Sequence, residues 1–414
     1  MAYSRSQFLK GALRFGAVGA IAPTLVMDGR LAERALAAGA RDANKNILVV
    51  LQLAGGNDGL NSLVPYGDGL YYQNRPTLAI PASQVLHLNN QVGFHPNLKA
   101  LKGLYDQGKV AVVQGVGYPN PNLSHFRSTD IWQSALPEGV SETGWLGRFL
   151  DTAMADVQNP LKAISIGPLL PKAFWSQHTL VPAVEDLKSF RFLATGQAAG
   201  ESQQVLSAFQ RIYGATSTAE GPYLSLVQMA DAGTYQATVQ IAKTAGTTTP
   251  NIPYPATDIA KSLKLVSQVI ATNLGTRVFM VTQSGYDDHA QEAQAHPRLM
   301  QDIGDAIAAF YQDMAAQGRS NQVLMMSFSE FGRRPLENAS NGTDHGAAAP
   351  MFIVGGTVKG GLYGKQPSLK DLDGDGNLKY TTDFRSVYST VLANWLGADP
   401  SKALEGSFPT IPFV

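Results

Sequence analysis

The sequence contains no cysteine among its 414 residues. Disulfide bonds, thiolate nucleophiles and cysteine-based zinc sites are therefore excluded. Any metal ion has to be bound by histidine, aspartate, glutamate or hydroxyl oxygens. Charged residues are also scarce, at 15%, and 32 basic residues balance 32 acidic ones. Without a surplus of positive charge, and without aromatic residues interleaved with basic clusters, we expect no nucleic-acid partner.

The amino-terminal segment lacks an apolar run long enough for a stable membrane span. The uncharged run from Phe15 to Met27 is short for a transmembrane helix. Basic residues precede this run, and Ala35-Leu-Ala37 follows it with the small-x-small pattern of a cleavage site. Residues 1–40 are therefore predicted to be an export signal and N-terminal segment, with an amphipathic helix of the mature domain as the alternative.

The first residues indicate an export route. Ser4-Arg-Ser-Gln-Phe-Leu-Lys10 resembles the twin-arginine signal, although Ser6 stands where the second arginine is expected. The predicted location is therefore outside the cytoplasm of a bacterium, periplasmic or extracellular.

Short apolar runs rich in β-branched residues predict buried strands. They are Ile47 to Leu53, Val110 to Val116, Arg277 to Thr282 and Val323 to Phe328. Amphipathic patterns such as Ile259 to Ile270 predict helices between them. This alternation predicts an α/β fold with a doubly wound, mainly parallel sheet. Further short strands are expected at Met351 to Gly355 and around Gly361 to Gly364, and a closing helix at Thr382 to Leu396 with Thr381 or Thr382 as its cap.

The middle of the chain has a different composition. Proline and glycine breaks are followed by a helical stretch rich in Ser, Thr, Ala and Gln from Gln203 to Ala245, and then by a proline-rich segment. We predict that residues 150–255 are a helical insertion or cap within a domain that spans residues 41–414.

Polar residues follow each of the four main predicted strands. Because parallel strands place their carboxyl ends at one edge of a sheet, the loops that carry these residues should meet there. Each acid alone could be an ordinary turn residue, but their shared edge favours a metal or anion site. Carboxylates and imidazoles bind divalent cations such as zinc, calcium, magnesium or manganese. The candidate ligands are Asp58, Asp287, His289, Glu330, Asp344 and His345.

The loop after the second strand holds a candidate nucleophile. Ser124, and after it Ser128, lies at the start of a predicted helix whose N–H groups would favour an oxyanion. Arg127 and Arg333 are candidates for binding the oxygens of that anion. The alternative is that the serine only caps the helix, that Arg127 is a surface residue and that Arg333 pairs with nearby acids.

Two other patterns have simpler interpretations. His296 precedes Pro297 and is expected to begin a helix, so His289 is the preferred ligand of the two. The segment Asp371 to Leu378 resembles a calcium loop, but Thr382 stands where such a loop needs a glutamate. A polar turn is the expected structure there.

Five motifs, in order, resemble those of a bacterial family. They are Leu53-Ala-Gly-Gly-Asn-Asp-Gly-Leu-Asn61, Leu123-Ser-His-Phe-Arg-Ser128, Tyr286-Asp-Asp-His-Ala-Gln291, Phe328-Ser-Glu-Phe-Gly-Arg-Arg334 and Gly342-Thr-Asp-His-Gly346. The family is the domain-of-unknown-function family fifteen-oh-one, which is related to the alkaline phosphatase and sulfatase superfamily. The resemblance covers nearly the whole chain and implies an alkaline phosphatase-like α/β domain.

The resemblance also implies roles for single residues. It makes Asp58 the first metal-binding aspartate and Ser124 the nucleophile. Asp287 and His289 become the middle ligand pair, and His345 the final ligand. Glu330 and Phe331 stand where the superfamily usually has an Asp-His pair, and phenylalanine cannot bind a metal. A single-metal site is therefore implied unless Asp344 supplies the missing ligand.

Together these roles imply an exported, metal-dependent hydrolase or transferase of phosphate or sulfate esters. A divalent ion would activate Ser124 to attack a small anionic ester, and Arg127 or Arg333 would bind the remaining oxygens. The alternative is a non-catalytic exported binding or assembly protein that retains the fold, with or without one structural metal ion. The substitution at Phe331 favours this alternative.

Overall fold

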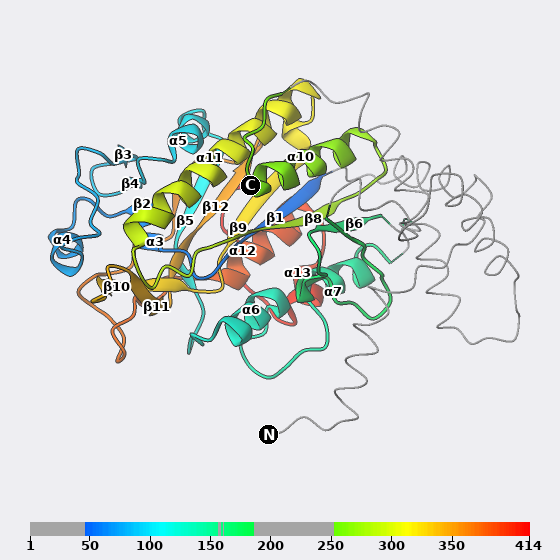
Figure 1. Ribbon diagram of the computed structural model, residues 1–414. Helices are drawn as coiled ribbons and strands as arrows, with labels where there is room; N and C mark the ends of the chain where they lie inside the picture. The colour runs from blue at the N-terminus through cyan, green and yellow to red at the C-terminus, as the bar shows by residue number, and fades with distance from the viewer. Residues whose placement is uncertain (1–45, 156–158, 160, 186–251) are drawn as a thin grey trace, which may run out of the picture.

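The computed structural model describes residues 46–155, 159, 161–185 and 252–414 (Figure 1). The predicted export signal and the greater part of the predicted mid-chain insertion lie outside these residues. The described chain is a mixed α/β protein around a nine-stranded sheet in the order β13-β5-β12-β9-β1-β8-β6-β7, with β14 beside β5.

The four main apolar runs are strands of this sheet, as predicted. β1 pairs in parallel with β8 and β9, β6 pairs in parallel with β8 and β7, and β12 runs antiparallel to β5 and β9. The prediction of a mainly parallel sheet is therefore confirmed. The strands are β1 (Ile47–Ala54), β5 (Val110–Gly117), β6 (Ala163–Ile166), β7 (Ala183–Val184), β8 (Val278–Ser284), β9 (Val323–Phe328), β12 (Ala349–Gly355), β13 (Gly361–Tyr363) and β14 (Thr382–Asp383).

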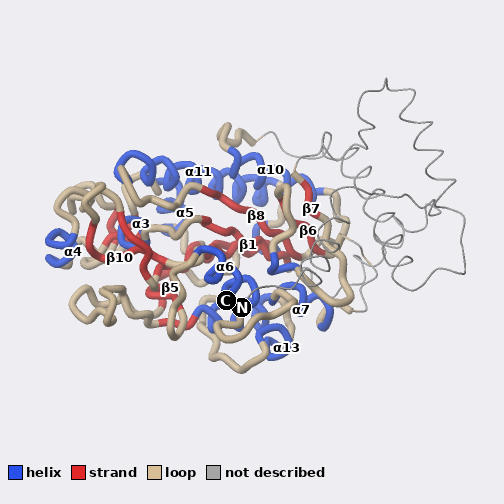
Figure 2. The backbone as a smooth tube through the Cα atoms, turned by 60° about the horizontal axis from the view of Figure 1, so that its bottom comes forward, coloured by secondary structure: helices blue, strands red, loops and turns tan. Residues whose placement is uncertain are grey.

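Helices cover both faces of the sheet (Figure 2). Successive residues of a strand point to opposite faces, and β1 shows this directly. Val49 and Leu51 join a core with α5 (Lys99–Asp106), α10 (Asp258–Ala271) and α11 (Glu292–Ala316). Leu48 and Val50 join the opposite core, whose helices are α6 (His125–Ser134), α7 (Trp145–Thr152), α12 (Phe384–Thr390) and α13 (Pro400–Leu404). Burial on both faces explains why β1 is an almost uninterrupted apolar run.

Smaller elements surround the carboxyl edge of the sheet. β10 (Gly332–Glu337) and β11 (Thr343–Gly346) form a hairpin, at the lower left of Figure 1. A second group comprises α3 (Gly59–Ser62), α4 (Gly69–Asn74), β2 (Leu63–Val64), β3 (Leu86–His87) and β4 (Gly93–Phe94). The remaining short helices are η1 (Lys172–Phe174), η2 (Ser320–Gln322) and η3 (Val391–Trp395). Among the described residues, none of the helices is both long and apolar enough to cross a membrane.

Two predicted boundaries differ from the structure. β6 and β7 belong to the central sheet although they fall inside the predicted 150–255 insertion, so the described residues of the sheet extend to Val184. The closing helix begins at Phe384, and its cap is Asp383, which accepts the N–H of Arg385 at 2.9 Å. The predicted cap Thr382 lies one residue before this position and pairs with Val116 in the sheet.

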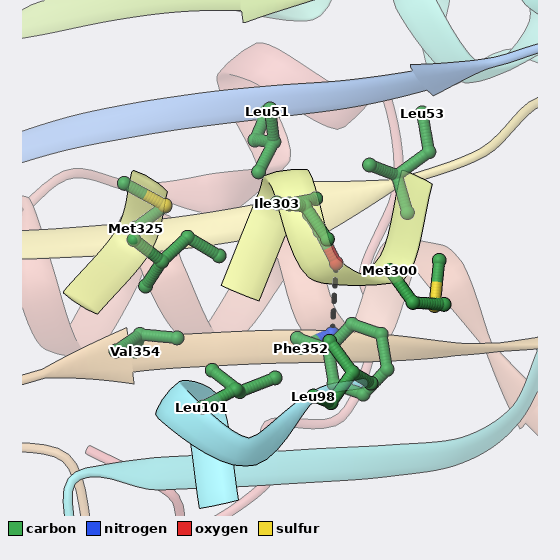
Figure 3. Close-up of a pocket in the computed structure, with 11 residues that line it drawn as sticks. Leu51, Leu53, Leu98, Leu101, Met300, Ile303, Met325, Phe352 and Val354 are labelled. Carbon is green, nitrogen blue, oxygen red and sulfur yellow. Dashed lines mark hydrogen bonds between the residues drawn. The ribbon is translucent and has the colours of Figure 1, made fainter. Parts of the chain in front are cut away.

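A small cavity in the core lies between α5, α11 and strands β1, β9 and β12 (Figure 3). Its walls are apolar except for Ser327, whose hydroxyl accepts the N–H of Phe352 at 2.9 Å. No ionisable side chain lines it. We therefore regard it as a packing void, and the residues with chemical potential lie elsewhere.

Candidate metal centre

Loops from four strands meet at the carboxyl edge of the sheet. His125 is the first residue of α6 and directly follows the loop after β5. The loop after β8 carries Asp287 and His289, and β11 carries His345. The loop after β1 contacts Arg333, next to the end of β9. The parallel direction of β1, β5, β8 and β9 brings together residues that lie far apart in the sequence.

One carboxylate oxygen lies at the centre of this group. Oδ1 of Asp287 is 3.5 Å from Nε2 of His125, 3.1 Å from Nε2 of His289 and 3.3 Å from Nε2 of His345. The Nε2 atoms of His289 and His345 are 2.9 Å apart. Ligand atoms around a tetrahedral zinc ion are about 3.3 Å from one another, given metal–ligand bonds of about 2.0–2.1 Å. The spacing of these donor atoms therefore fits one small divalent cation.

The other ring nitrogen of each histidine faces an acceptor. Nδ1 of His345 donates to the carbonyl of Leu123 at 2.8 Å. Nδ1 of His125 is 3.0 Å from Oε1 of Glu330, and Nδ1 of His289 is 3.5 Å from Oδ1 of Asp344.

These contacts determine which atoms face the centre. A carbonyl cannot donate, so the proton of neutral His345 is on Nδ1 and its Nε2 presents a lone pair. Nδ1 of His125 faces the carboxylate of Glu330 in the same way, so Nε2 of His125 and Nε2 of His345 can both present lone pairs. The ligand atoms of His125, Asp287 and His345 all lie within 4.8 Å of one another, and His289 lies beside this group. A donor set this rich in electrons fits a cation.

The electrostatics of the site favour the forms that bind metal. Burial lowers the pKa of His345, and the charge of Arg333 lowers it further, which outweighs the bond to Leu123. Partial burial would raise the pKa of Asp287, but the hydrogen bond and the positive charge of Arg333 bring it below its ordinary value. Neutral imidazole and ionised carboxylate are the ligating forms.

Arg333 holds the site together. It is 1% exposed, and Nε donates to the carbonyl of Gly56 at 2.7 Å. Nη1 donates to the carbonyl of Thr343, and Nη2 donates to the carbonyls of Gly55 and Tyr286 and to Oδ1 of Asp287. All three nitrogens are bound to protein acceptors. This geometry does not support the predicted role of Arg333 in binding substrate oxygens.

Phe331 is an apolar residue that packs against two histidines of the site. Its ring is buried, with its centroid 4.3 Å from that of His345 and 4.9 Å from that of His125. Gly56 makes room for it, because a Cβ there would lie 2.3 Å from the Phe331 ring and the backbone φ is +83°. Phe331 therefore packs against the imidazoles of both His125 and His345.

The predicted nucleophile is exposed beside His125. Ser124 is at the N-cap position of α6, but its side chain makes no capping hydrogen bond. The alternative, Ser128, is buried and bonded to the hydroxyl of Tyr118 and the carbonyl of Glu330. Arg127 pairs with Asp130 and donates to the carbonyls of Pro137 and Gly139, so the structure gives it a structural role.

Asp58 lies outside this group of ligands. It is fully buried, and its carboxylate caps α3 by accepting the N–H of Leu60. The same carboxylate forms a bidentate ion pair with Arg75. Burial alone would raise the pKa of Asp58, but the guanidinium of Arg75 brings it well below its ordinary value. Arg75 already neutralises this carboxylate, so the geometry does not support the predicted role of Asp58 as a ligand.

His125 is not among the ligands predicted from the sequence. It carries the same signal as His289 and His345, an imidazole in a polar segment after a strand, and it directly follows the candidate nucleophile Ser124. His296 lies buried in α11, with Nδ1 3.4 Å from Oδ2 of Asp288. The segment from Asp371 to Leu378 is a turn in which Asp373 accepts backbone N–H groups of its own loop.

The fold and the site define a mixed α/β protein with a cluster of histidine and aspartate at the carboxyl edge of its sheet. The chain belongs to the family of proteins of unknown function DUF1501, whose model matches residues 45–406. This confirms the family that the five motifs predicted.

The structure is similar to several solved structures, each at low sequence identity and a TM-score below 0.5. The PsFucS1 sulfatase from Pseudoalteromonas sp. is 12% identical, with 94% of this chain and 75% of that chain covered and a TM-score of 0.39. An alkaline phosphatase superfamily protein from Vibrio parahaemolyticus is 10% identical, with coverages of 92% and 79% and a TM-score of 0.38. The periplasmic domain of EcEptC from Escherichia coli, in complex with Zn, is 10% identical, with coverages of 90% and 92% and a TM-score of 0.38. No curated protein sequence matches the chain.

Proposed function

We propose that this protein binds one divalent ion of the zinc class through His125, Asp287, His289 and His345. The observation that carries the proposal is the position of Asp287 Oδ1, within 3.5 Å of three imidazole nitrogens. Imidazole suits zinc and related transition metals, whereas calcium and magnesium take oxygen ligands. Of the predicted ions, zinc therefore fits this donor set best. When bound, such an ion acts as a Lewis acid and lowers the pKa of a nearby hydroxyl.

We also propose that the protein is an exported hydrolase or transferase of phosphate or sulfate esters, with Ser124 as the nucleophile. Two features of Ser124 support this role. Its hydroxyl is exposed and not used for capping, and it directly precedes His125. The first N–H groups of the ten-residue helix α6 would favour the charge of a transferred oxyanion.

A non-catalytic binding or assembly protein is the second candidate. Four protein ligands are typical of structural zinc sites, whereas catalytic sites keep three and leave one position open. If His125 binds the ion, the site has the four protein ligands of a structural centre; if it does not, one position stays open as in a catalytic centre. Nε2 of His125 is the most distant of the three imidazole nitrogens from Asp287 Oδ1, at 3.5 Å.

Metal content tests the centre itself. Purified protein, stripped with a chelator and reloaded with zinc, should hold about one ion per chain by elemental analysis. Asp287→Ala and His345→Ala should each abolish this binding, while the control His178→Ala, an exposed histidine outside the cluster, should not. Wild-type protein that retains no zinc would refute the metal centre.

Turnover tests the choice between enzyme and binding protein. Aryl phosphate and aryl sulfate esters should be hydrolysed by the zinc-loaded protein, and Ser124→Ala should lower kcat by roughly 10³-fold or more while retaining the metal. Turnover that survives in Ser124→Ala would exclude this nucleophile. A wild-type protein that holds zinc but turns over neither ester would favour the structural centre.

A further inference from the structure

We infer that Glu330 and Asp344 lie outside the ligand shell and set the metal affinity by holding His125 and His289 in the ligating orientation. The inference rests on the proposed metal centre. Both acids were expected to be ligands themselves. Each faces the Nδ1 edge of a histidine, so the imidazole ring lies between the carboxylate and the shared point next to Asp287.

Glu330 is the better fixed of the two. Its side chain is almost fully buried, and the same Oε1 atom accepts the N–H of Gly55 at 2.8 Å and faces Nδ1 of His125 at 3.0 Å. The backbone of the loop after β1 thus anchors the oxygen that orients His125. A carboxylate behind a histidine fixes which nitrogen carries the proton and raises the basicity of the other.

Asp344 acts on His289 with help from Asn338. The Nδ2 group of Asn338 donates to Oδ1 of Asp344 at 3.1 Å and to the carbonyl of His289 at 2.9 Å. It therefore joins both members of the pair. The side chain of Asp344 is 52% exposed and its oxygen is 3.5 Å from Nδ1 of His289, so this support should be weaker than that of Glu330.

His345 supplies an internal comparison. Its Nδ1 is held by the main-chain carbonyl of Leu123, which side-chain substitution leaves in place. Removing Glu330 or Asp344 should therefore loosen one ligand and leave the contact behind His345 intact. Loss of such an outer partner typically weakens metal binding about 10–100-fold.

The test is zinc affinity, measured by competition with a chromophoric chelator, together with the visible spectrum of the cobalt-substituted protein. Glu330→Ala should bind zinc about 10–100-fold more weakly and change the cobalt spectrum. Glu330→Gln should recover most of this affinity, because the Gly55 N–H keeps the amide oxygen at the Oε1 position. Asp344→Ala should show a smaller loss, and Asp344→Asn should restore it.

Glu337→Ala is the matched control. Glu337 lies on the same hairpin, but its carboxylate accepts from Thr77 and Leu78 and contacts no histidine. Its zinc affinity should match that of the wild type. Asp344→Ala tests the inference independently if Glu330→Ala fails to fold.

Two failures can be told apart. Wild-type protein that binds no zinc overturns the proposed metal centre and this inference with it. Wild-type protein that binds zinc, with Glu330→Ala and Asp344→Ala within about twofold of its affinity and with its cobalt spectrum, overturns only the inference. Equal losses in the Ala and Gln variants of Glu330 would also overturn it, since orientation by an acceptor would then play no part.

Discussion

The variant Asp58→Ala distinguishes the metal-ligand role that the motif predicts for Asp58 from the buried ion-pair role that the structure shows. As a metal ligand, Asp58 would be essential for zinc binding and its removal would cost little stability. In the structure it is instead the buried partner of Arg75, and both side chains are 0% exposed. Removing one partner of a buried ion pair costs about 3–5 kcal/mol, because the other charge is left without compensation.

The neighbourhood of Asp58 refines this magnitude. Arg75 keeps its bonds to the carbonyls of Pro335 and Arg334, each at 3.0 Å. Burial and the charge of Asp58 raise the pKa of Glu292 to about 9, so Glu292 is neutral beside the pair. Without Asp58, Glu292 can ionise and partly replace it. We therefore expect a loss of about 3 kcal/mol in Asp58→Ala and a larger loss when Glu292→Gln is added.

The assay for Asp58→Ala combines urea unfolding with zinc titration of the folded variant. The expected result is a lower free energy of unfolding with an unchanged number of zinc ions per folded chain. A variant as stable as the wild type that no longer binds zinc would refute the reasoning. It would restore Asp58 to the ligand role that its motif position implied.

Two further predictions concern pH and packing. Burial lowers the pKa of His95 from 6.5 to about 3, so the folded protein keeps it neutral while the unfolded chain takes up a proton below pH 6.5. The contribution of neutral His95 to stability is complete above pH 6.5 and falls by about 2–3 kcal/mol between pH 6.5 and 4.5. The variant His95→Asn can still accept the Asn97 N–H, and its free energy of unfolding should change less with pH over this window. Equal pH slopes for the variant and the wild type would contradict the lowered pKa of His95. Gly56→Ala should lower the free energy of unfolding in urea by about 2 kcal/mol or more and weaken zinc binding. The reason is that the new Cβ meets the Phe331 ring and that the φ of +83° is strained for alanine. A variant with wild-type zinc affinity would show that Phe331 does not orient the histidines.

The main strands could be predicted because burial on both faces requires a short, apolar, β-branched run. β6 and β7 could not, because they have four and two residues, too few for a periodic pattern to separate from a loop. The closing helix was predicted, but its first residue was not, because Thr382 and Asp383 pair with β5, a contact distant in sequence.

The edge of the sheet at which the site lies could also be predicted, because parallel strands bring their carboxyl ends together. The role of each side chain there could not. Glu330 and His125 share this edge, and only their orientation decides which one reaches the ligand position. The sequence pattern likewise carries no sign that Asp58 faces inward to Arg75 instead of joining Asp287.

Arg333 makes the site preorganised. Arg333 joins the loops after β1 and β8 to strand β11 and pairs with His345 in the hairpin, so it positions Asp287 and His345 in the folded chain. The entropy cost of ordering these loops is therefore met during folding and does not reduce the affinity for a ligand. A metal ion that binds there needs no rearrangement of the chain. Arg333 sets the positions of the ligands Asp287 and His345 without being a ligand itself.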